Sequence, residues 1–189
     1  MTHKRLLVIM VAGLLLLPSS SLASPSEAYS PYDAYFKLSS TRYLPEYDYR
    51  QLIAQCRQES GPDFSTFARS PAGAVGVCQF MAPTWTDAQL ALGFISSRTN
   101  PRLNVKAAAW YMRKMLFVWR GRGRSLEEKL PLARSAYNCG TGCVLRAQRK
   151  ASDARDWQEL APYLPAEARD YPIHIGRHYK RMTEDVAVY

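Results

Sequence analysis

The chain has 189 residues, of which 47% are hydrophobic and 22% charged, and it carries a formal net charge of +9 at pH 7. These proportions are typical of a globular protein and exclude a disordered, collagen-like or polytopic membrane chain. The basic excess favours an anionic partner, such as nucleic acid, phospholipid or a cell-wall polymer.

Residues 1–23 have the pattern of a secretory signal peptide. Lys4 and Arg5 precede an apolar run over residues 6–17, and small residues follow up to Ala23, where cleavage fits best. The run is too short for a membrane-spanning helix, which needs about 20 residues. We therefore expect an exported chain, periplasmic or secreted, without stable membrane insertion after cleavage. Export also argues against nucleic acid as the partner.

Residues 24–46 contain Ser, Pro and Tyr without a sustained period, which predicts an extended or poorly regular N-terminal arm. The rest of the chain, residues 47–189, is expected to form one mainly α domain. Its first helix should cover residues 47–60, because apolar side chains recur on one side at helical spacing before Gly61 and Pro62 stop the helix.

The segment that follows must turn sharply. Gly73 and Gly76 lie among small and branched residues, which suits a small β-hairpin or an irregular glycine-rich loop. Pro83 can occupy the first position of the next helix, and Gly93 should end it.

Helices dominate the remainder of the chain. A long core helix is expected from Asn104 to a stop at Gly121. Ser125 and Glu128 then have the spacing of a capping box, and Pro131 should bend the helix that they begin or restart it. A last helical pattern covers residues 165–182, and Pro172 is expected to break it internally.

Four cysteines remain after cleavage, and an even number in an exported chain predicts two disulfides. The favoured pairs are Cys139 with Cys143 and Cys56 with Cys78, although the sequence leaves the other connectivities open. A zinc site is the weaker alternative, because the chain has no Cys-x-x-Cys pair and its histidines lie elsewhere. We expect no metal.

Glu59 is the most informative single residue. A carboxyl group in the last turn of a helix feels the negative end of the helix dipole, and burial beside Leu52 and Cys56 would add a desolvation cost. Both effects favour the protonated acid, whereas a free Glu would already be ionised near neutral pH. From periodicity alone, a solvated helix-end Glu is the simpler interpretation.

Three motifs follow one another along the domain: QES at residues 58–60, SPAGAVGVCQFMAPTW at 70–85 and SAYNCGTG at 135–142. Together with Tyr171, they resemble the transglycosylase SLT family of lytic transglycosylases, which are relatives of goose-type lysozyme. The resemblance extends over about residues 52–182. It implies a lysozyme-like α fold, a long groove for the glycan strands of peptidoglycan, and no metal or organic cofactor.

The resemblance also implies roles for individual residues. Glu59 would be the essential acid, and Ser60 would help to orient it. Amide and phenol groups can hydrogen-bond the acetamido and hydroxyl groups of a sugar strand. The side chains that would line the groove in this way are Gln79, Tyr137, Asn138 and Tyr171. For the two tyrosines, ordinary helix packing is the alternative.

The chain departs from the family pattern at several positions. Cys78 stands where the family commonly has Met, which would allow a disulfide to brace this segment. The stretch after Glu59 is slightly longer than usual and contains Asp63, the nearest acid in the sequence and a candidate second carboxylate. Pro172 directly follows Tyr171 and should kink the segment that carries it.

The implied activity is that of a peptidoglycan lytic transglycosylase, a lyase that cleaves the β-1,4 bond between MurNAc and GlcNAc and forms 1,6-anhydroMurNAc. One carboxyl group would act first as general acid and then as general base. The alternatives are a lysozyme-type muramidase, which uses an activated water, and a non-catalytic cell-wall-binding module. The expected partner is peptidoglycan, and the sequence does not identify any partner in a secretion machinery.

Overall fold

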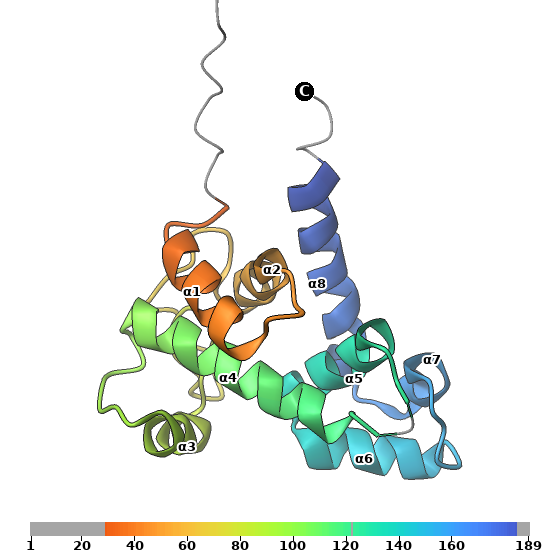
Figure 1. Ribbon diagram of the computed structural model, residues 1–189. Coiled ribbons are helices and arrows are strands. Elements are labelled where there is room, and N and C mark those ends of the chain that lie inside the picture. Colours follow the sequence, from red (N-terminus) through yellow and green to blue (C-terminus); the bar gives the residue numbers. More distant parts are fainter. Residues whose placement is uncertain (1–28, 122, 185–189) are drawn as a thin grey trace, which may run out of the picture.

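The computed structural model describes residues 29–121 and 123–184, so the predicted signal peptide lies outside the described residues. The described chain is mainly helical, as predicted, and Figure 1 shows its arrangement. Its elements in chain order are α1 (Asp33–Tyr43), α2 (Tyr49–Ser60), α3 (Ala82–Leu92), α4 (Pro101–Val118), α5 (Leu126–Cys139), α6 (Thr141–Lys150), α7 (Trp157–Leu160), η1 (Ala161–Tyr163) and α8 (Ala166–Glu184).

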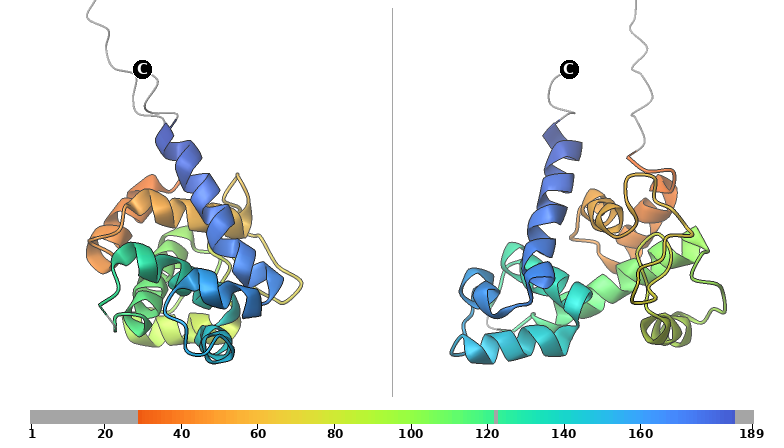
Figure 2. Two further views of the ribbon diagram at one scale, coloured as in Figure 1. Left: turned by 90° about the vertical axis from the view of Figure 1, so that its right-hand side faces the viewer. Right: turned by 180° about the vertical axis from the view of Figure 1, so that it is seen from behind.

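Helix α4 is the central helix, in agreement with the long core helix predicted here. It packs against α1, α3 and α5, and its alanines on the buried side allow these neighbours to approach closely. Figure 2 shows α8 standing against α2 and α5, the two helices with which it makes most of its contacts. None of the described helices is both long enough and apolar enough to cross a membrane.

The described part of the expected N-terminal arm is helical, which corrects the prediction of an extended segment. Helix α1 packs against α2 and α4, and Phe36 is fully buried in an edge-to-face contact with Phe64. Ser39 and Ser40 complete the buried face. The buried side of α1 contains two serines and only one Phe, so it is hardly more hydrophobic than the exposed side. The sequence therefore shows no clear helical period of apolar residues here.

The predicted helix ends are largely confirmed. Helix α2 ends at Gly61 and α3 at Gly93, and the capping box between Ser125 and Glu128 is formed in both directions. Helix α4 begins at Pro101, three residues before the predicted start. The side chain of Asn100 accepts a hydrogen bond from the Leu103 N–H at 3.1 Å, and Pro101 lacks only an N–H that the first turn does not need.

Neither helical proline interrupts its helix, so the break expected at Pro172 and the restart considered at Pro131 are both absent. In α5, Pro131 leaves the carbonyl group of exposed Glu127 open to water. In α8, Pro172 removes the donor for the carbonyl group of Ala168. The Ser135 hydroxyl of α5 donates to that carbonyl oxygen at 2.9 Å, so the buried acceptor is satisfied from a neighbouring helix.

The segment between α2 and α3 is an irregular loop, one of the two forms predicted. Within residues 69–80, which we call the glycine-rich loop, the pairing is limited to isolated bridges of Val75 with Arg69 and with Phe80. Both favoured disulfides are formed: Cys56 with Cys78 joins this loop to α2, and Cys139 with Cys143 joins the end of α5 to α6.

Candidate active site

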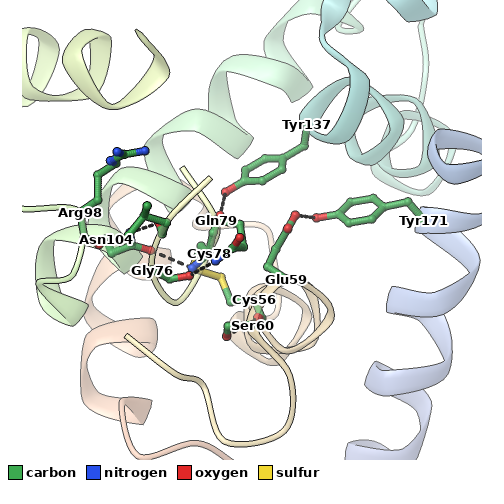
Figure 3. Close-up of a disulfide and its surroundings, with 11 residues drawn as sticks. Cys56, Glu59, Ser60, Gly76, Cys78, Gln79, Arg98, Asn104, Tyr137 and Tyr171 are labelled. Atoms are coloured by element: carbon green, nitrogen blue, oxygen red, sulfur yellow. Dashed lines mark hydrogen bonds between the residues drawn. A yellow bond between two sulfur atoms is a disulfide. The ribbon is translucent and has the colours of Figure 1, made fainter. Parts of the chain in front are cut away.

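A groove of about 870 Å³ runs between the end of α2, the glycine-rich loop, the end of α5 and the first turns of α8. Of the six predicted site residues, the structure brings five to this groove: Glu59, Gln79, Tyr137, Asn138 and Tyr171. Figure 3 shows the side chains of Glu59, Tyr137 and Tyr171 converging from three different helices.

Glu59 is the second-last residue of α2 and lines the groove, whereas the residues one turn earlier in the helix are buried in the core. Burial raises the pKa of the Glu59 carboxyl group to about 7, and the nearby negative charge of Glu167 contributes to the rise, while a hydrogen bond from Tyr171 opposes it. A carboxyl group with this pKa holds its proton at neutral pH in an appreciable fraction of molecules and can also release it.

Tyr171 lies on α8, and its hydroxyl group donates a hydrogen bond to Oε1 of Glu59. The helix continues through Pro172, so the predicted kink does not displace Tyr171 from the groove. Its ring is buried, with 4% of the residue exposed, and burial beside Glu59 keeps the pKa of the phenol well above its usual value. Tyr171 therefore stays a neutral donor that fixes one oxygen of the carboxyl group.

Tyr137 lies at the end of α5, and its hydroxyl group donates to the carbonyl oxygen of Cys78 at 3.0 Å. Its ring packs edge to face against Tyr111 of α4, with a centroid distance of 5.1 Å. Burial raises the pKa of the Tyr137 phenol well above its usual value. The predicted alternatives of packing and groove lining are therefore combined in one residue, which lines the groove and also ties α5 to the glycine-rich loop.

Gln79 and Ser60 differ in where their side chains lie. Gln79 lines the groove, and its amide nitrogen donates to the carbonyl oxygens of Ala68 at 3.0 Å and Gly76 at 2.9 Å. Ser60 is not brought to the Glu59 carboxyl group, because its hydroxyl group donates to the Cys56 carbonyl oxygen at 3.1 Å within α2. Figure 3 shows Ser60 on the side of the helix away from the two tyrosines.

The model of the transglycosylase SLT domain matches residues 40–160 of this chain. The chain belongs to the transglycosylase SLT family. It is 27% identical over 161 residues to the membrane-bound lytic murein transglycosylase F of Vibrio cholerae, with 74% of this chain and 29% of the relative covered. The protein of the same description from Haemophilus influenzae is 32% identical over 136 residues, with 69% and 27% covered.

Solved structures of family members support the lysozyme-like α fold. An inactive mutant of the lytic transglycosylase Slt from Pseudomonas aeruginosa matches with a TM-score of 0.67 and 20% identity, over 83% of this chain and 24% of that one. The 70 kDa soluble lytic transglycosylase from Escherichia coli matches with a TM-score of 0.64 and 22% identity, over 82% and 24%. The chain thus spans less than a third of the length of these relatives.

Two acidic residues of the SLT groove were missed in the sequence. Glu167 and Asp170 line it from the start of α8, and Glu167 accepts a hydrogen bond from the Asn138 amide at 3.2 Å. Together with Tyr171 and His174 they recur at helical spacing on one face of α8, which is a signal that the sequence did contain.

The candidate second carboxylate, Asp63, is exposed and is not among the residues that line the groove. Among the described residues, no group of three or more His, Cys, Asp or Glu side chains is arranged to hold a metal ion. The titratable groups of the groove are therefore carboxyl groups, phenols and one imidazole, which suit proton transfer.

Proposed function

We propose that this protein is a lytic transglycosylase that acts on the glycan strands of peptidoglycan, with Glu59 as its single general acid and base. The observation that carries the proposal is the position of Glu59, which lies in the groove with a pKa of about 7 and a hydrogen bond from Tyr171. The names of the relatives, lytic murein transglycosylases, support the substrate class.

In the first step, protonated Glu59 donates its proton to the glycosidic oxygen between MurNAc and GlcNAc while the bond from that oxygen to C1 breaks. The acetamido oxygen of the same MurNAc stabilises the positive charge that develops at C1. Glu59 is then a carboxylate, and the hydrogen bond from Tyr171 stabilises this form.

In the second step, the Glu59 carboxylate removes the proton from the C6 hydroxyl group of the MurNAc. The C6 oxygen then bonds to C1 and neutralises the positive charge there, which closes the 1,6-anhydro ring. Glu59 is protonated again, and no water has been consumed. Because one carboxyl group must serve as acid and as base, a pKa near neutrality suits both steps.

A lysozyme-type muramidase is a second candidate, and one observation favours it. Glu167 and Asp170 bring additional carboxyl groups to the groove, and a hydrolase needs one to activate a water or to act as nucleophile. In this structure, however, Glu167 accepts a hydrogen bond from Asn138, and Asp170 is paired with Arg169 at 2.9 Å. Both carboxylates are thus engaged with neighbouring side chains.

Product analysis tests the proposal directly. The full chain, produced in an oxidising compartment, is incubated with purified peptidoglycan, and the soluble products are identified by mass spectrometry. We expect anhydro-muropeptides, which are lighter by one water than hydrolytic products. Products with reducing ends alone would identify a muramidase, and binding without turnover would identify a wall-binding module.

Variants connect the products to the site. Glu59→Gln keeps the shape of the side chain but cannot transfer a proton, so it should bind glycan strands and release no products. Asp63→Asn makes the same chemical change at the exposed acid outside the groove, and its turnover should match that of the unmodified chain. Equal loss in both variants would contradict a specific role of Glu59.

The same proposal includes export of the protein to the periplasm or beyond the cell. Its support is the N-terminal pattern of residues 1–23 together with the two disulfides, since disulfides form and persist in oxidising compartments. Cell fractionation with a C-terminal epitope tag tests it, and recovery of the protein only from the cytoplasm would contradict it.

A further inference from the structure

Cys56 and Glu59 are neighbours on α2. They are three residues apart, so their side chains leave the same side of the helix one turn from each other. Cys56 is fully buried and forms a disulfide with Cys78 of the glycine-rich loop, with a Cα–Cα distance of 4.5 Å. The helix that carries the candidate acid is therefore covalently joined to the glycine-rich loop, which lines the groove beside it.

Cys78 is also held by two hydrogen bonds of its backbone. Its N–H donates to Oδ1 of Asn104 in α4 at 2.8 Å, and its carbonyl oxygen accepts the Tyr137 hydroxyl of α5 at 3.0 Å. Figure 3 shows how α2, α4, α5 and the loop meet at this one residue. Asn104 is fully buried, and its amide nitrogen also donates to the Arg98 carbonyl oxygen at 2.7 Å.

The residue after Cys78 is Gln79, which lines the groove in a left-handed backbone conformation with φ of 48°. A non-glycine residue in this conformation costs about 1 kcal/mol or more and persists only where its surroundings hold it. The disulfide and the hydrogen bond from Cys78 to Asn104 fix the backbone on the N-terminal side of Gln79. The glycine-rich loop, which forms one wall of the groove, thus depends on Cys78 for its conformation.

We propose that the disulfide between Cys56 and Cys78 is a positioning element of the active site, which holds the Glu59 carboxyl group at a fixed separation from the glycine-rich wall. The inference rests on the proposed function of Glu59. Neither cysteine lines the groove, so both act through Glu59 and Gln79 rather than on the substrate. The link is made at Cys78, the position at which the sequence resemblance gives Met, a side chain that cannot form a disulfide.

Loss of the cross-link should make the Glu59 carboxyl group more accessible to water. Without it, the loop can relax from the strained conformation at Gln79, and water can approach the carboxyl group, whose pKa then falls towards the ordinary value. The other titratable groups that line the groove come from α4, α5 and α8, which do not carry the cross-link: Tyr111, Tyr137, Glu167, Asp170, Tyr171 and His174.

Two double variants remove the cross-link in the full chain: Cys56→Ala with Cys78→Ala, and Cys56→Ala with Cys78→Met, which inserts the residue common in the family. Both are assayed on peptidoglycan strands well below their melting temperatures. We expect kcat to fall about tenfold to a hundredfold, because small displacements of a catalytic group cost this much, while KM changes much less. The basic limb of the pH–rate profile should move to lower pH.

A second readout does not depend on turnover. The Glu59 carboxyl carbon, labelled with carbon-13 and assigned by its absence in Glu59→Gln, is titrated by NMR. We expect a lower midpoint in both double variants than in the unmodified chain. If the unmodified chain made no anhydro products but the midpoint still shifted, the proposed function would fail while the positioning by the disulfide would stand.

Leu160→Ala is the matched control for stability. Leu160 is fully buried in α7 and lies outside the groove, so its truncation should lower the melting temperature without moving the titration midpoint or the pH–rate profile. If the double variants behaved like Leu160→Ala, with a lower melting temperature but unchanged kcat and midpoint, the disulfide would be a stabilising link only, and the inference would be overturned.

Discussion

The helical wall of the groove and its glycine-rich wall differ in what holds their side chains in place. Glu59, Tyr137 and Tyr171 project from regular helices whose backbones are satisfied mainly by the hydrogen bonds of each helix, apart from the Ala168 carbonyl group of α8, which accepts from Ser135. The glycine-rich loop lacks such a ladder, and contacts with Arg98 and Asn104, far along the chain, hold its backbone. The second wall should therefore be more sensitive to single substitutions at a distance.

Gly76→Ala should have the largest effect. The backbone of Gly76 has φ of 93°, and an added Cβ would collide with the Arg98 carbonyl oxygen and the Asn104 amide. We expect the free energy of unfolding to fall by about 3 to 5 kcal/mol, because backbone strain and steric overlap add. Urea unfolding followed by circular dichroism measures this change.

Gly73→Ala is the control for that substitution. Gly73 has a similar φ of 89°, but no atom lies within 4 Å of an added Cβ. Only the strain of the backbone remains, so we expect a loss of about 1 to 2 kcal/mol. An equal loss at both glycines would show that the close approach to α4 does not matter.

Asn104→Ala should have the next largest effect. The substitution removes the acceptor of the Cys78 N–H, which is buried, and the donor to the Arg98 carbonyl oxygen, which is partly buried. Unsatisfied buried groups cost about 1 to 3 kcal/mol each, and we expect a total loss of about 2 to 4 kcal/mol together with reduced turnover per folded molecule.

Asn100→Ala serves as its counterpart on the helical side. Asn100 caps α4 at its first turn, and the loss of such a cap costs about 1 kcal/mol. Because this substitution weakens a helix end rather than the loop, turnover per folded molecule should stay unchanged. A reduction in turnover as large as that of Asn104→Ala would contradict the proposed difference between the two walls.

The same difference explains which features could be predicted from the sequence. Helix ends at Gly61, at Gly93 and at the Ser125–Glu128 box depend on local chemistry, and they were predicted within a few residues. The continuity of α8 through Pro172 was not predictable, because it depends on a hydrogen bond from Ser135 to Ala168, a residue 33 positions away.

Site residues follow the same rule. The motifs placed Glu59, Tyr137 and Tyr171 correctly on helices that meet at the groove, since each position is set by its own helix. The Ser60 hydroxyl group bonds within α2 and not to Glu59, because a serine near a helix end readily bonds back to the carbonyl four residues earlier. The contact between Asn138 and Glu167 needed the packing of α5 against α8, which the local sequence does not describe.

On the helical wall, Glu59 lowers the free energy of unfolding at neutral and higher pH. Its folded pKa of about 7 lies above the ordinary value of 4.5, so between these values the folded protein keeps a proton that the unfolded chain has lost. The free energy of unfolding therefore falls as the pH rises through this window. At about pH 8, Glu59→Gln should be more stable than the unmodified chain by up to about 3 kcal/mol, since one pKa unit corresponds to about 1.4 kcal/mol.

Chemical denaturation at a series of pH values measures that difference. It should shrink as the pH falls towards about 4.5, where Glu59 of the unmodified chain is protonated in the folded state and increasingly in the unfolded state. A difference that stayed constant over the whole range would contradict a raised pKa and point to packing of the amide instead.

Tyr171→Phe should have the smallest effect on stability and the most specific one on proton transfer. The hydrogen bond from its hydroxyl group lowers the pKa of Glu59, against the effect of burial. Its removal should raise that pKa further, so the basic limb of the pH–rate profile should move to higher pH by up to about one unit, which is the range of a single hydrogen bond to a charged group.

Tyr179→Phe makes the same change two turns further along α8. Its hydroxyl group donates to Asp48 at 2.9 Å, and Tyr179 does not line the groove, so the limb should stay where it is in the unmodified chain. The direction at Tyr171 is opposite to that expected for loss of the disulfide, where water gains access to Glu59. A shift to lower pH in Tyr171→Phe would mean that the phenol excludes water from the carboxyl group more than it stabilises its charge.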